Sequence, residues 1–464
     1  MTTRIKVRHD TASNWNTNNP VLALGEPGFE LDTNRVKYGD GVTAWVSLPY
    51  SGAGADLNGD INIGNMAGHC SQATESIAIG NYAGLLGQQV HNVAIGQSAG
   101  ANFQQYLSVA VGRSAGSCGQ GHSAVAIGHI AAQCSQQYGA VAVGNRAGRY
   151  NQGNQSVAVG YNAATYGQGY HSVAIGSCAA NCCQQVLTVA IGRAAGVGGQ
   201  HYSAVAIGHI TGQYNQGHGA VALGTRSGRY CQSAESVAVG HGAAAYYQRC
   251  HSVAIGACAG RCCQGYVAVA VGRSAGACCQ WSGATAVGHL AGQSDQHYGA
   301  VAVGSHAGRY SQQSETIAIG QNAAAYCQGY HGIAIGSYAG SYNQGWLTVA
   351  IGRSAGVCSQ GGSAVAIGHI AGQCHQNNAA VAIGTRAGRY SQGEYAIALG
   401  AHAATCNQAS RSIVINASGN YIQSAGVDTT VIQTLRTVTG GTAPAGFSPV
   451  YYDPISGELI VVTS

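Results

Sequence analysis

One glycine recurs at every sixteenth position through most of this chain. It closes a segment of the type Val-Ala-Ile-Gly, first at Gly64 and last at Gly400, in 22 copies without an insertion or deletion. The next position in phase is Asn416, where the pattern ends. A fixed short period of this kind indicates a repeat architecture in which each unit packs on its neighbours.

Apolar residues alternate within each copy, as in Val173-Ala174-Ile175. Val and Ile therefore share one face of a short strand, and Ala takes the other. A unit of this size cannot bury its own apolar face, and Val/Ile-Gly runs disfavour helix. We therefore predict an all-β fold, a parallel β-solenoid (β-roll) of 22 sixteen-residue coils over residues 61–415. At the usual strand spacing this rod would be about 105 Å long.

Charge and motif content exclude several function classes. Charged residues make up only 8% of the chain, and residues 61–415 hold no Lys, 14 Arg and five acids. Without a Lys/Arg run we expect no nucleic-acid partner. Paired carboxylates and a Ser-His-Asp set are missing, so we expect no enzyme and no catalytic residue. No Cys/His spacing of the zinc type occurs, and we expect no metal and no cofactor.

The N-terminus is polar, and no apolar stretch is long enough for a membrane helix. We expect synthesis in the host cytoplasm without a signal peptide and no membrane insertion. The 17 Cys would then form disulfides only late, if at all.

A glutamine stands eight positions after the repeat glycine in all 22 copies. Stacked one coil apart, such side chains can form an amide ladder that holds the register, which we favour over a ligand-binding role. The predicted structural ladder begins with Gln72, Gln88, Gln104, Gln120, Gln136 and Gln152.

The sixth position after the glycine holds Cys nine times and Tyr nine times. Equivalent atoms one coil apart lie near 4.8 Å, which suits inter-coil disulfides, and free buried thiols are the equal alternative. The candidate disulfide residues are Cys118, Cys134, Cys262, Cys278, Cys358 and Cys374. Dipeptides such as Cys182-Cys183 are expected to direct their side chains to opposite faces.

Tyrosines at this sixth position fall on successive coils in two runs. If exposed, they form a stacking platform for sugars; if buried, they fill a corner of the coil, which we favour because Cys shares the position. The candidate glycan-stacking residues are Tyr214, Tyr230, Tyr246, Tyr310, Tyr326 and Tyr342.

Blocks of five copies also repeat, every 80 residues. Arg113 and His129 each recur at this interval, and so does Arg149 in a Gly-Arg-Tyr motif. We favour block duplication as the cause, over a chemical pattern displayed every ~24 Å along the coils.

The repeat unit Ser-Val-Ala-Ile-Gly-x-x-Ala-Gly resembles the head repeats of trimeric autotransporter adhesins, which form trimeric left-handed parallel β-rolls. It is also similar to related repeats in fibre proteins of phages and giant viruses, where a Gln lies between copies. The resemblance covers residues 61–415 and implies a homotrimer.

Residues 1–50 are similar to the N-terminal module of many phage fibre proteins, and residues 51–60 form a linker. Gly39-Asp40-Gly41 predicts a turn between short strands, and Trp15 and Trp45 a small core. The resemblance implies attachment to a virion or tail component. The residues that carry it are Arg8 to Thr11, Asn14-Trp15, Asn19 to Leu22, Gly25 to Glu30, Lys37 to Gly41, Trp45 and Ser47 to Tyr50.

Residues 416–464 are predicted to form a C-terminal β-hairpin cap, with its turn at Asp453 to Gly457. The stretch from Thr437 to Leu459 resembles the segment before the self-cleaving chaperone of many fibre proteins. This implies a processing point at or beside Ser464.

Together these features predict a structural fibre or shaft of a virus or phage, located on the virion surface, that projects from the particle and mediates attachment to the host. Its partners would be itself, the virion, and a host-surface glycan or protein. The alternative is a bacterial or other cell-surface trimeric adhesin, which the missing signal peptide opposes. A glycan-degrading fibre is opposed by the scarcity of acids.

Overall fold

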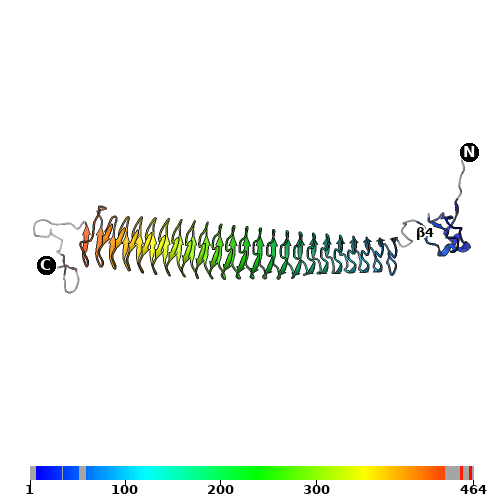
Figure 1. The fold of residues 1–464 in the computed structure, drawn as a ribbon, viewed down its shortest axis with the longest axis horizontal. Coiled ribbons are helices and arrows are strands. Elements are labelled where there is room, and N and C mark those ends of the chain that lie inside the picture. The colour runs from blue at the N-terminus through cyan, green and yellow to red at the C-terminus, as the bar shows by residue number, and fades with distance from the viewer. Residues whose placement is uncertain (1–6, 34, 52–58, 434–449, 453–458, 462–464) are drawn as a thin grey trace, which may run out of the picture. The chain divides into compact units, whose positions relative to one another are not determined.

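The computed structural model describes residues 7–33, 35–51, 59–433, 450–452 and 459–461. The chain forms two compact units, which comprise residues 1–251 and residues 252–464. Both consist mainly of stacked coils, which Figure 1 shows as successive pairs of short arrows coloured by residue number. This confirms the all-β parallel β-solenoid with sixteen-residue coils.

The first unit begins with a small module over residues 7–51. Its four strands hydrogen-bond in the order β1-β2-β3-β4, with β1 parallel to β2 and the other neighbours antiparallel. The predicted core is present, because the rings of Trp15 and Trp45 stack with centroids 4.0 Å apart and Leu22 is fully buried beside them. The elements are β1 (Arg8–Asp10), α1 (Ala12–Asn18), β2 (Pro27–Glu30), β3 (Val36–Tyr38), the 3₁₀ helix η1 (Trp45–Ser47) and β4 (Tyr50–Ser51).

After the first coil, in which β5 is the one strand, each coil of the first unit has two strands of three residues, and each strand belongs to one of two parallel sheets. The first sheet holds β5 (Ile61–Ile63), β6 (Ile77–Ile79), β8 (Val93–Ile95), β10 (Val109–Val111), β12 (Val125–Ile127), β14 (Val141–Val143), β16 (Val157–Val159), β18 (Val173–Ile175), β20 (Val189–Ile191), β22 (Val205–Ile207), β24 (Val221–Leu223) and β26 (Val237–Val239). The second sheet holds β7 (Leu86–Gln88), β9 (Asn102–Gln104), β11 (Cys118–Gln120), β13 (Cys134–Gln136), β15 (Tyr150–Gln152), β17 (Tyr166–Gln168), β19 (Cys182–Gln184), β21 (Gly198–Gln200), β23 (Tyr214–Gln216), β25 (Tyr230–Gln232) and β27 (Tyr246–Gln248).

The second unit repeats this plan. Its first sheet holds β28 (Val253–Ile255), β30 (Val269–Val271), β32 (Thr285–Val287), β34 (Val301–Val303), β36 (Ile317–Ile319), β38 (Ile333–Ile335), β40 (Val349–Ile351), β42 (Val365–Ile367), β44 (Val381–Ile383), β46 (Ile397–Leu399), β48 (Ile413–Asn416) and β49 (Thr430–Gln433). Its second sheet holds β29 (Cys262–Gln264), β31 (Cys278–Gln280), β33 (Ser294–Gln296), β35 (Tyr310–Gln312), β37 (Tyr326–Gln328), β39 (Tyr342–Gln344), β41 (Cys358–Gln360), β43 (Cys374–Gln376), β45 (Tyr390–Gln392) and β47 (Cys406–Gln408).

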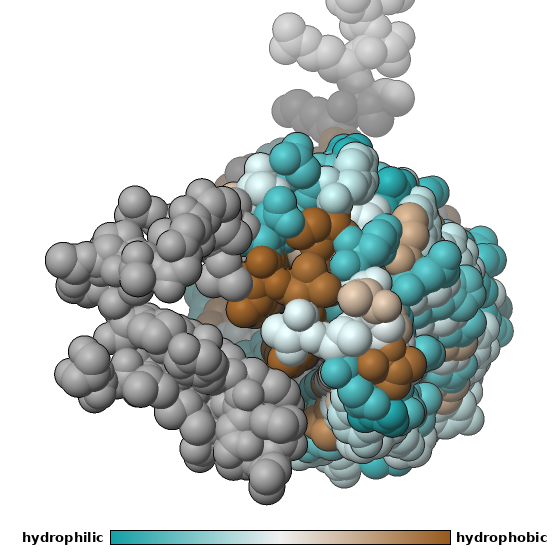
Figure 2. All heavy atoms as spheres, turned by 90° about the vertical axis from the view of Figure 1, so that its left-hand side faces the viewer, coloured by the Kyte–Doolittle hydropathy of each residue, from teal (hydrophilic) through white to brown (hydrophobic). Residues whose placement is uncertain are grey.

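Strand pairing follows the sequence period through the regular coils, as in Val125 opposite Val141. The parallel ladder continues past residue 415, because β49 pairs with β48. In this pair Ile413 lies opposite Thr430, so the two partners are one residue farther apart in sequence than in the regular repeat. Figure 2 views this end and shows hydrophobic atoms gathered among hydrophilic ones. Farther on, β50 (Val450–Tyr452) and β51 (Leu459–Val461) pair in antiparallel fashion, while the predicted turn between them lies outside the described residues.

The interior of the coils is built from small residues and amides. In the first strands the central Ala, such as Ala126, is fully buried, whereas the flanking Val and Ile face outward and are half-buried or exposed. Alternation along the strand thus separates the two faces as expected, with Ala on the inner one. The only side chains of more than alanine size that point inward in nearly every coil are the glutamines.

The repeat glycine is required by the distance between coils. Gly128 has φ +129°, and a Cβ added there would lie 2.5 Å from the carbonyl oxygen of Gly144 in the next coil. Any side chain at this position would push the coils apart and would have to adopt a conformation that L residues rarely take.

The glutamine amides link the two sheets and the successive coils. Gln120 Nε2 donates to Gln136 Oε1 at 3.2 Å, to the Val109 carbonyl at 2.8 Å and to the Ala124 carbonyl at 3.1 Å. Its own oxygen accepts from Gln104 at 2.9 Å. The amide therefore satisfies backbone carbonyls that the narrow interior excludes from water.

The other residues predicted for the ladder lie on the same line. Gln88, Gln136 and Gln152 each donate to the glutamine sixteen residues later, at 3.1, 3.1 and 3.3 Å. Gln72, in the first coil, donates to the Ser76 carbonyl instead. The second unit has a ladder of its own, with Gln280 donating to Gln296 at 3.1 Å, and it is interrupted at Gln344, which donates to the Gly356 carbonyl.

We predict that Gln120→Leu destabilises the coils around it by roughly 2–3 kcal/mol, because the Gln104 amide loses its acceptor and the Val109 carbonyl loses its donor. Hydrogen exchange of the β10 to β14 amides would measure the local loss. The matched control is Gln137→Leu, since Gln137 is exposed one residue past the same ladder. Equal protection in the two variants would contradict a stabilising ladder.

Candidate functional site

The N-terminal module combines two buried ionisable residues, Lys37 and Glu30, with an apolar hollow on its surface. Lys37 is 3% exposed, and its Nζ donates to the Trp45 carbonyl at 2.8 Å and lies 4.3 Å from the centre of the Tyr50 ring. Burial lowers the pKa of Lys37, while nearby Glu30 opposes the shift. Glu30 is fully buried and accepts from the Tyr50 hydroxyl at 2.8 Å.

The loop after β3 is held by a carboxylate. Asp40 accepts from the backbone N–H groups of Val42 and Thr43 and from the Thr43 hydroxyl, and these hydrogen bonds lower its pKa to about 2. Asp40 thus stabilises the chain reversal that Gly39-Asp40-Gly41 predicted.

An open hollow of about 450 Å³ lies on the module between β1, β2 and β3. Its lining is mostly apolar, with Val7, Leu31 and Tyr38 substantially exposed. A hydrophobic hollow on a small module is a surface at which another chain can be bound.

Comparison with protein families gives a match at this module. Residues 5–43 match the major tropism determinant N-terminal domain. The matched segment includes β1, α1, β2 and β3, and therefore most of the Trp15–Trp45 core. The similarity supports a phage-related protein and is consistent with a component of the virion. No curated protein and no solved structure matches the chain.

The Tyr residues at the sixth position form stacked rows on the outside of the second sheets. In the first unit the rings of Tyr214, Tyr230 and Tyr246 follow one another at 5.5 and 5.3 Å. Tyr214 is 39% exposed and Tyr230 and Tyr246 are half-buried, so these rings lie against the outer surface of the coils and not in the interior. The cause is the narrow coil, whose interior has room for Ala and one Gln but not for a phenol ring.

The second unit holds an equivalent row. Tyr310, Tyr326 and Tyr342 are spaced by 5.3 and 5.0 Å, and the last is 47% exposed. Because neighbouring rings cover each other's faces, a sugar could stack only on the outer faces at the ends of a row. Arg309 already lies over Tyr310, with 4.7 Å between its guanidinium carbon and the ring centre.

Sequence reasoning missed a second aromatic row, at the tenth position after the glycine. Tyr106, His122 and Tyr138 follow one another at 6.2 and 5.5 Å, and Tyr138 is 51% exposed. The recurrence of Tyr, His and Trp at this position was the signal that could have revealed it. The next coil carries Asn154 instead, so one face of Tyr138 has no aromatic neighbour.

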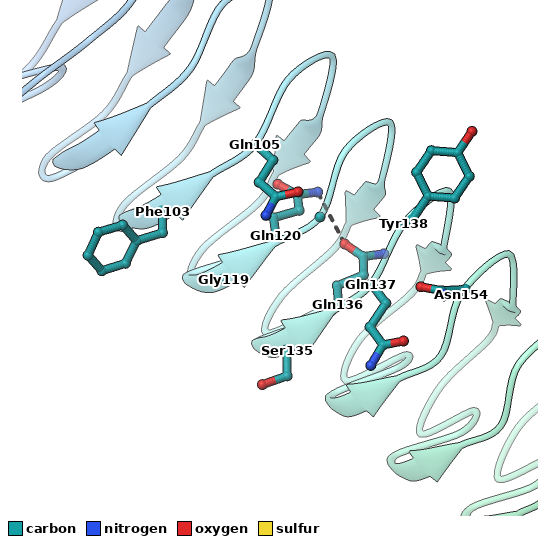
Figure 3. A pocket seen from close by; sticks show the side chains of 10 residues that line it. Phe103, Gln105, Gly119, Gln120, Ser135, Gln136, Gln137, Tyr138 and Asn154 are labelled. Atoms are coloured by element: carbon teal, nitrogen blue, oxygen red, sulfur yellow. Dashed lines mark hydrogen bonds between the residues drawn. The ribbon is translucent and has the colours of Figure 1, made fainter.

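A hollow of about 380 Å³ opens beside Tyr138 (Figure 3). It exists because Gly119 has no side chain, while Phe103 and Ser135 point away from the coils on either side. Its remaining lining is rich in amides and includes Gln105, Gln137 and Asn154. Aromatic and amide groups together provide the stacking and hydrogen bonding that neutral sugars require.

The candidate disulfide residues lie opposite one another in three strand pairs, Cys118–Cys134, Cys262–Cys278 and Cys358–Cys374. All are free thiols in the structure. Burial, and next the hydrogen bond with Cys118, raise the pKa of Cys134 to about 11. The same two causes, with Cys358 as the partner, raise the pKa of Cys374 to about 11.

The Cys dipeptides differ from the expected geometry. The sulfur atoms of Cys182 and Cys183 are 2.9 Å apart and do not point to opposite faces. The reason is the backbone, because Cys183 has φ +57° and interrupts the alternation within β19.

Three acids of the coils lie beside a histidine of the next coil. Glu75 Oε2 is 2.9 Å from His91 Nδ1, and the pair recurs as Glu235–His251 and Glu315–His331 at 3.1 and 3.2 Å. Each carboxylate thus contacts a histidine at the surface, where even a charged pair contributes little to stability. Among the described residues, no group of three or more His, Cys, Asp or Glu is placed to hold a metal ion. No helix in the described part of the chain is long and apolar enough to span a membrane.

We predict that Cys134 and Cys374 are alkylated at pH 8 at least about tenfold more slowly than exposed Cys263, because a thiol of raised pKa is almost entirely protonated there. Iodoacetamide labelling followed by quantitative peptide mass spectrometry gives the rates. Rates similar to that of Cys263 would contradict the raised pKa of these two thiols. Recovery of a Cys118–Cys134 disulfide from freshly purified protein would do so as well.

Proposed function

We propose that this chain is the shaft of a phage fibre, assembled as a homotrimer, which is fixed to the virion by its N-terminal module and carries the attachment surface for the host. The observation that supports this most directly is the match of residues 5–43 to the major tropism determinant N-terminal domain, followed in the same chain by a β-solenoid. Within each unit, coils stacked in one register suit a part that projects from the particle.

The outward aliphatic face supports self-association. In the regular coils, apart from Thr285 of β32, the first strand presents two Val, Ile or Leu side chains outward, and Ile127, Ile175 and Ile255 are 39%, 38% and 41% exposed. Within each unit these residues form a continuous apolar strip of many coils. Soluble monomers rarely expose apolar patches of more than a few hundred Å². Only a partner with the same sixteen-residue period matches the strip throughout its length, and a second copy of this chain meets that requirement.

The proposal assigns no catalytic activity to the chain. The acids of the coils are few, and Glu75, Glu235 and Glu315 stand 80 or more residues apart, each beside a histidine. Glycan cleavage would need two carboxylates within about 10 Å. The exposed aromatic rows and the hollow at Tyr138 are instead suited to binding.

We predict that the purified chain has three times its monomer mass in solution, measured by native mass spectrometry or light scattering. Placing Asp at Ile127, Ile175 and Ile207 should dissociate the trimer, because charges would then be buried in the apolar strip. The control places Asp at Phe103, which is 69% exposed on the other sheet and should leave the trimer intact. A stable wild-type monomer would overturn the trimeric assembly.

Attachment can be tested by competition. The purified trimer should occupy host receptors and lower the adsorption rate of the phage that encodes it. An antibody against the coils should label fibres on intact particles by electron microscopy. Unlabelled particles would contradict the virion location, and an unchanged adsorption rate at saturating protein would contradict the attachment role.

A further inference from the structure

A cluster of basic side chains forms on one turn of three successive coils. It consists of Arg113 and His129, one position after their glycines, and of Arg146 and Arg149 in the following coil. We call this set the cationic cluster. It recurs 80 residues apart, starting at Arg193, Arg273 and Arg353. The third copy has His306 where the first has Arg146.

The members of the cluster are held in place by contacts across the coils. Nη2 of Arg113 hydrogen-bonds Nε2 of His129, and the equivalent pairs in the third and fourth copies are 2.7 and 2.9 Å apart. The backbone N–H of Arg146 donates to the His129 carbonyl at 2.9 Å. Because the imidazole accepts from a guanidinium, it is neutral in this arrangement, and the remaining N–H groups of the arginine stay available.

Arg149 is positioned separately but acts on the same histidine. Its Nε donates to Gln133 Oε1 at 2.9 Å, and its guanidinium lies 4.6 Å from the centre of the Tyr150 ring. Partial burial, and then the charges of Arg113, Arg146 and Arg149, lower the pKa of His129. His129 is therefore exposed to the charge of three guanidinium groups, and hydrogen bonds hold two of them, those of Arg113 and Arg149, in place.

No carboxylate compensates these charges. The ion pairs of the described residues all involve other groups, and none includes a member of a cationic cluster. Glu75, Glu235 and Glu315 stand eleven positions after their glycines, away from the turn that carries the arginines. Convergent arginines without an acidic partner are the arrangement that binds phosphate or carboxylate groups in bidentate fashion.

The spacing of the clusters favours a polymer as the ligand. Each unit carries two clusters, five coils apart, which corresponds to about 24 Å. The coils between them are nearly uncharged. A duplex nucleic acid is instead bound by closely spaced cations, because its phosphates are only a few ångströms apart. An acidic polysaccharide with intermittent charged groups can engage two clusters at once and gain avidity.

We propose that the cationic clusters bind the phosphate or carboxylate groups of an anionic polysaccharide on the host surface. That the clusters bind anions is inferred from the clusters alone. That they bind the host receptor also rests on the attachment function proposed above. The superperiod of 80 residues thereby acquires a role, since it repeats one oxyanion-binding group along the coils.

Binding of the full-length chain to immobilised polysaccharides tests the inference. The probes are phosphorylated lipopolysaccharide, the same material after enzymatic dephosphorylation, polygalacturonate, neutral dextran and a DNA duplex. We expect binding to phosphorylated lipopolysaccharide or polygalacturonate that weakens with added salt, and none to dextran. Dephosphorylation separates the two sources, because only phosphate-dependent binding is lost.

Matched variants separate the cluster from net charge. R113Q/R193Q removes one guanidinium from each cluster of the first unit and should weaken polymer binding at least tenfold. R113K/R193K keeps the charge but loses the bidentate geometry and should give an intermediate loss. R249Q/R411Q removes the same charge outside the clusters and should bind like the wild type. Unchanged thermal unfolding verifies that each variant folds.

Several outcomes would overturn the inference. Equal losses of polymer binding in R113Q/R193Q and R249Q/R411Q would show attraction by net charge alone. Tighter binding of DNA than of either polysaccharide would show that the ligand is a nucleic acid and not a polysaccharide. If R113Q/R193Q loses polymer binding but still competes for phage adsorption as the wild type does, the receptor role fails while the anion site stands. If the wild type binds polymer but does not compete, the proposed attachment function fails instead.

Discussion

The glutamine amide inside each coil is the interaction on which the rest of the structure depends. A coil of sixteen residues has two sheets so close together that no water remains between them to satisfy the backbone carbonyls that face inward. Gln120 of the second sheet donates to the carbonyl of Val109 in the first sheet, to that of Ala124 just before the next first strand, and to the amide of Gln136 in the next coil. Burial of these amides is tolerated where they find partners within the ladder, as from Gln104 to Gln152, whereas the ladder is interrupted at Gln344.

The narrow interior also determines where the large side chains lie. Beside the glutamine the inward positions hold mostly Ala and Gly, with a few Ser, Thr and Asn, and Gly128 shows that even a methyl group is excluded at the closest approach of two coils. The Val, Ile and Tyr residues that would form the core of a globular domain are therefore placed outside. An apolar strip on the outer face of the first sheets is the consequence, and it is the surface that the proposed self-association would cover.

Because the coils are regularly spaced, a residue type that recurs at one position of the repeat forms a row on the surface. A residue type that recurs every sixteen positions meets its copy in the next coil, which gives the stacked rings of Tyr214 and Tyr230 and the paired thiols of Cys118 and Cys134. A residue type that recurs every eighty positions gives isolated groups, as in the cationic clusters. Left-handed residues such as Cys183 at the middle of the second strands add a further row of outward side chains. Surface chemistry can thus change without disturbing the buried ladder.

The period by itself determined the parallel solenoid, the sixteen-residue register and the line of glutamines, because a strict repeat without insertions permits one stacking only. The sequence of the N-terminal module also indicated the Trp15–Trp45 core, since a small module must bury its largest rings. The tertiary structure decided what alternation leaves open, namely that Ala faces inward and Val and Ile outward, because only the width of the coil selects between the two faces. It likewise decided the exposure of Tyr214, the contact between Cys182 and Cys183 and the continuation of the ladder to β49. These features depend on backbone conformation and on contacts between coils, which residue order alone does not specify.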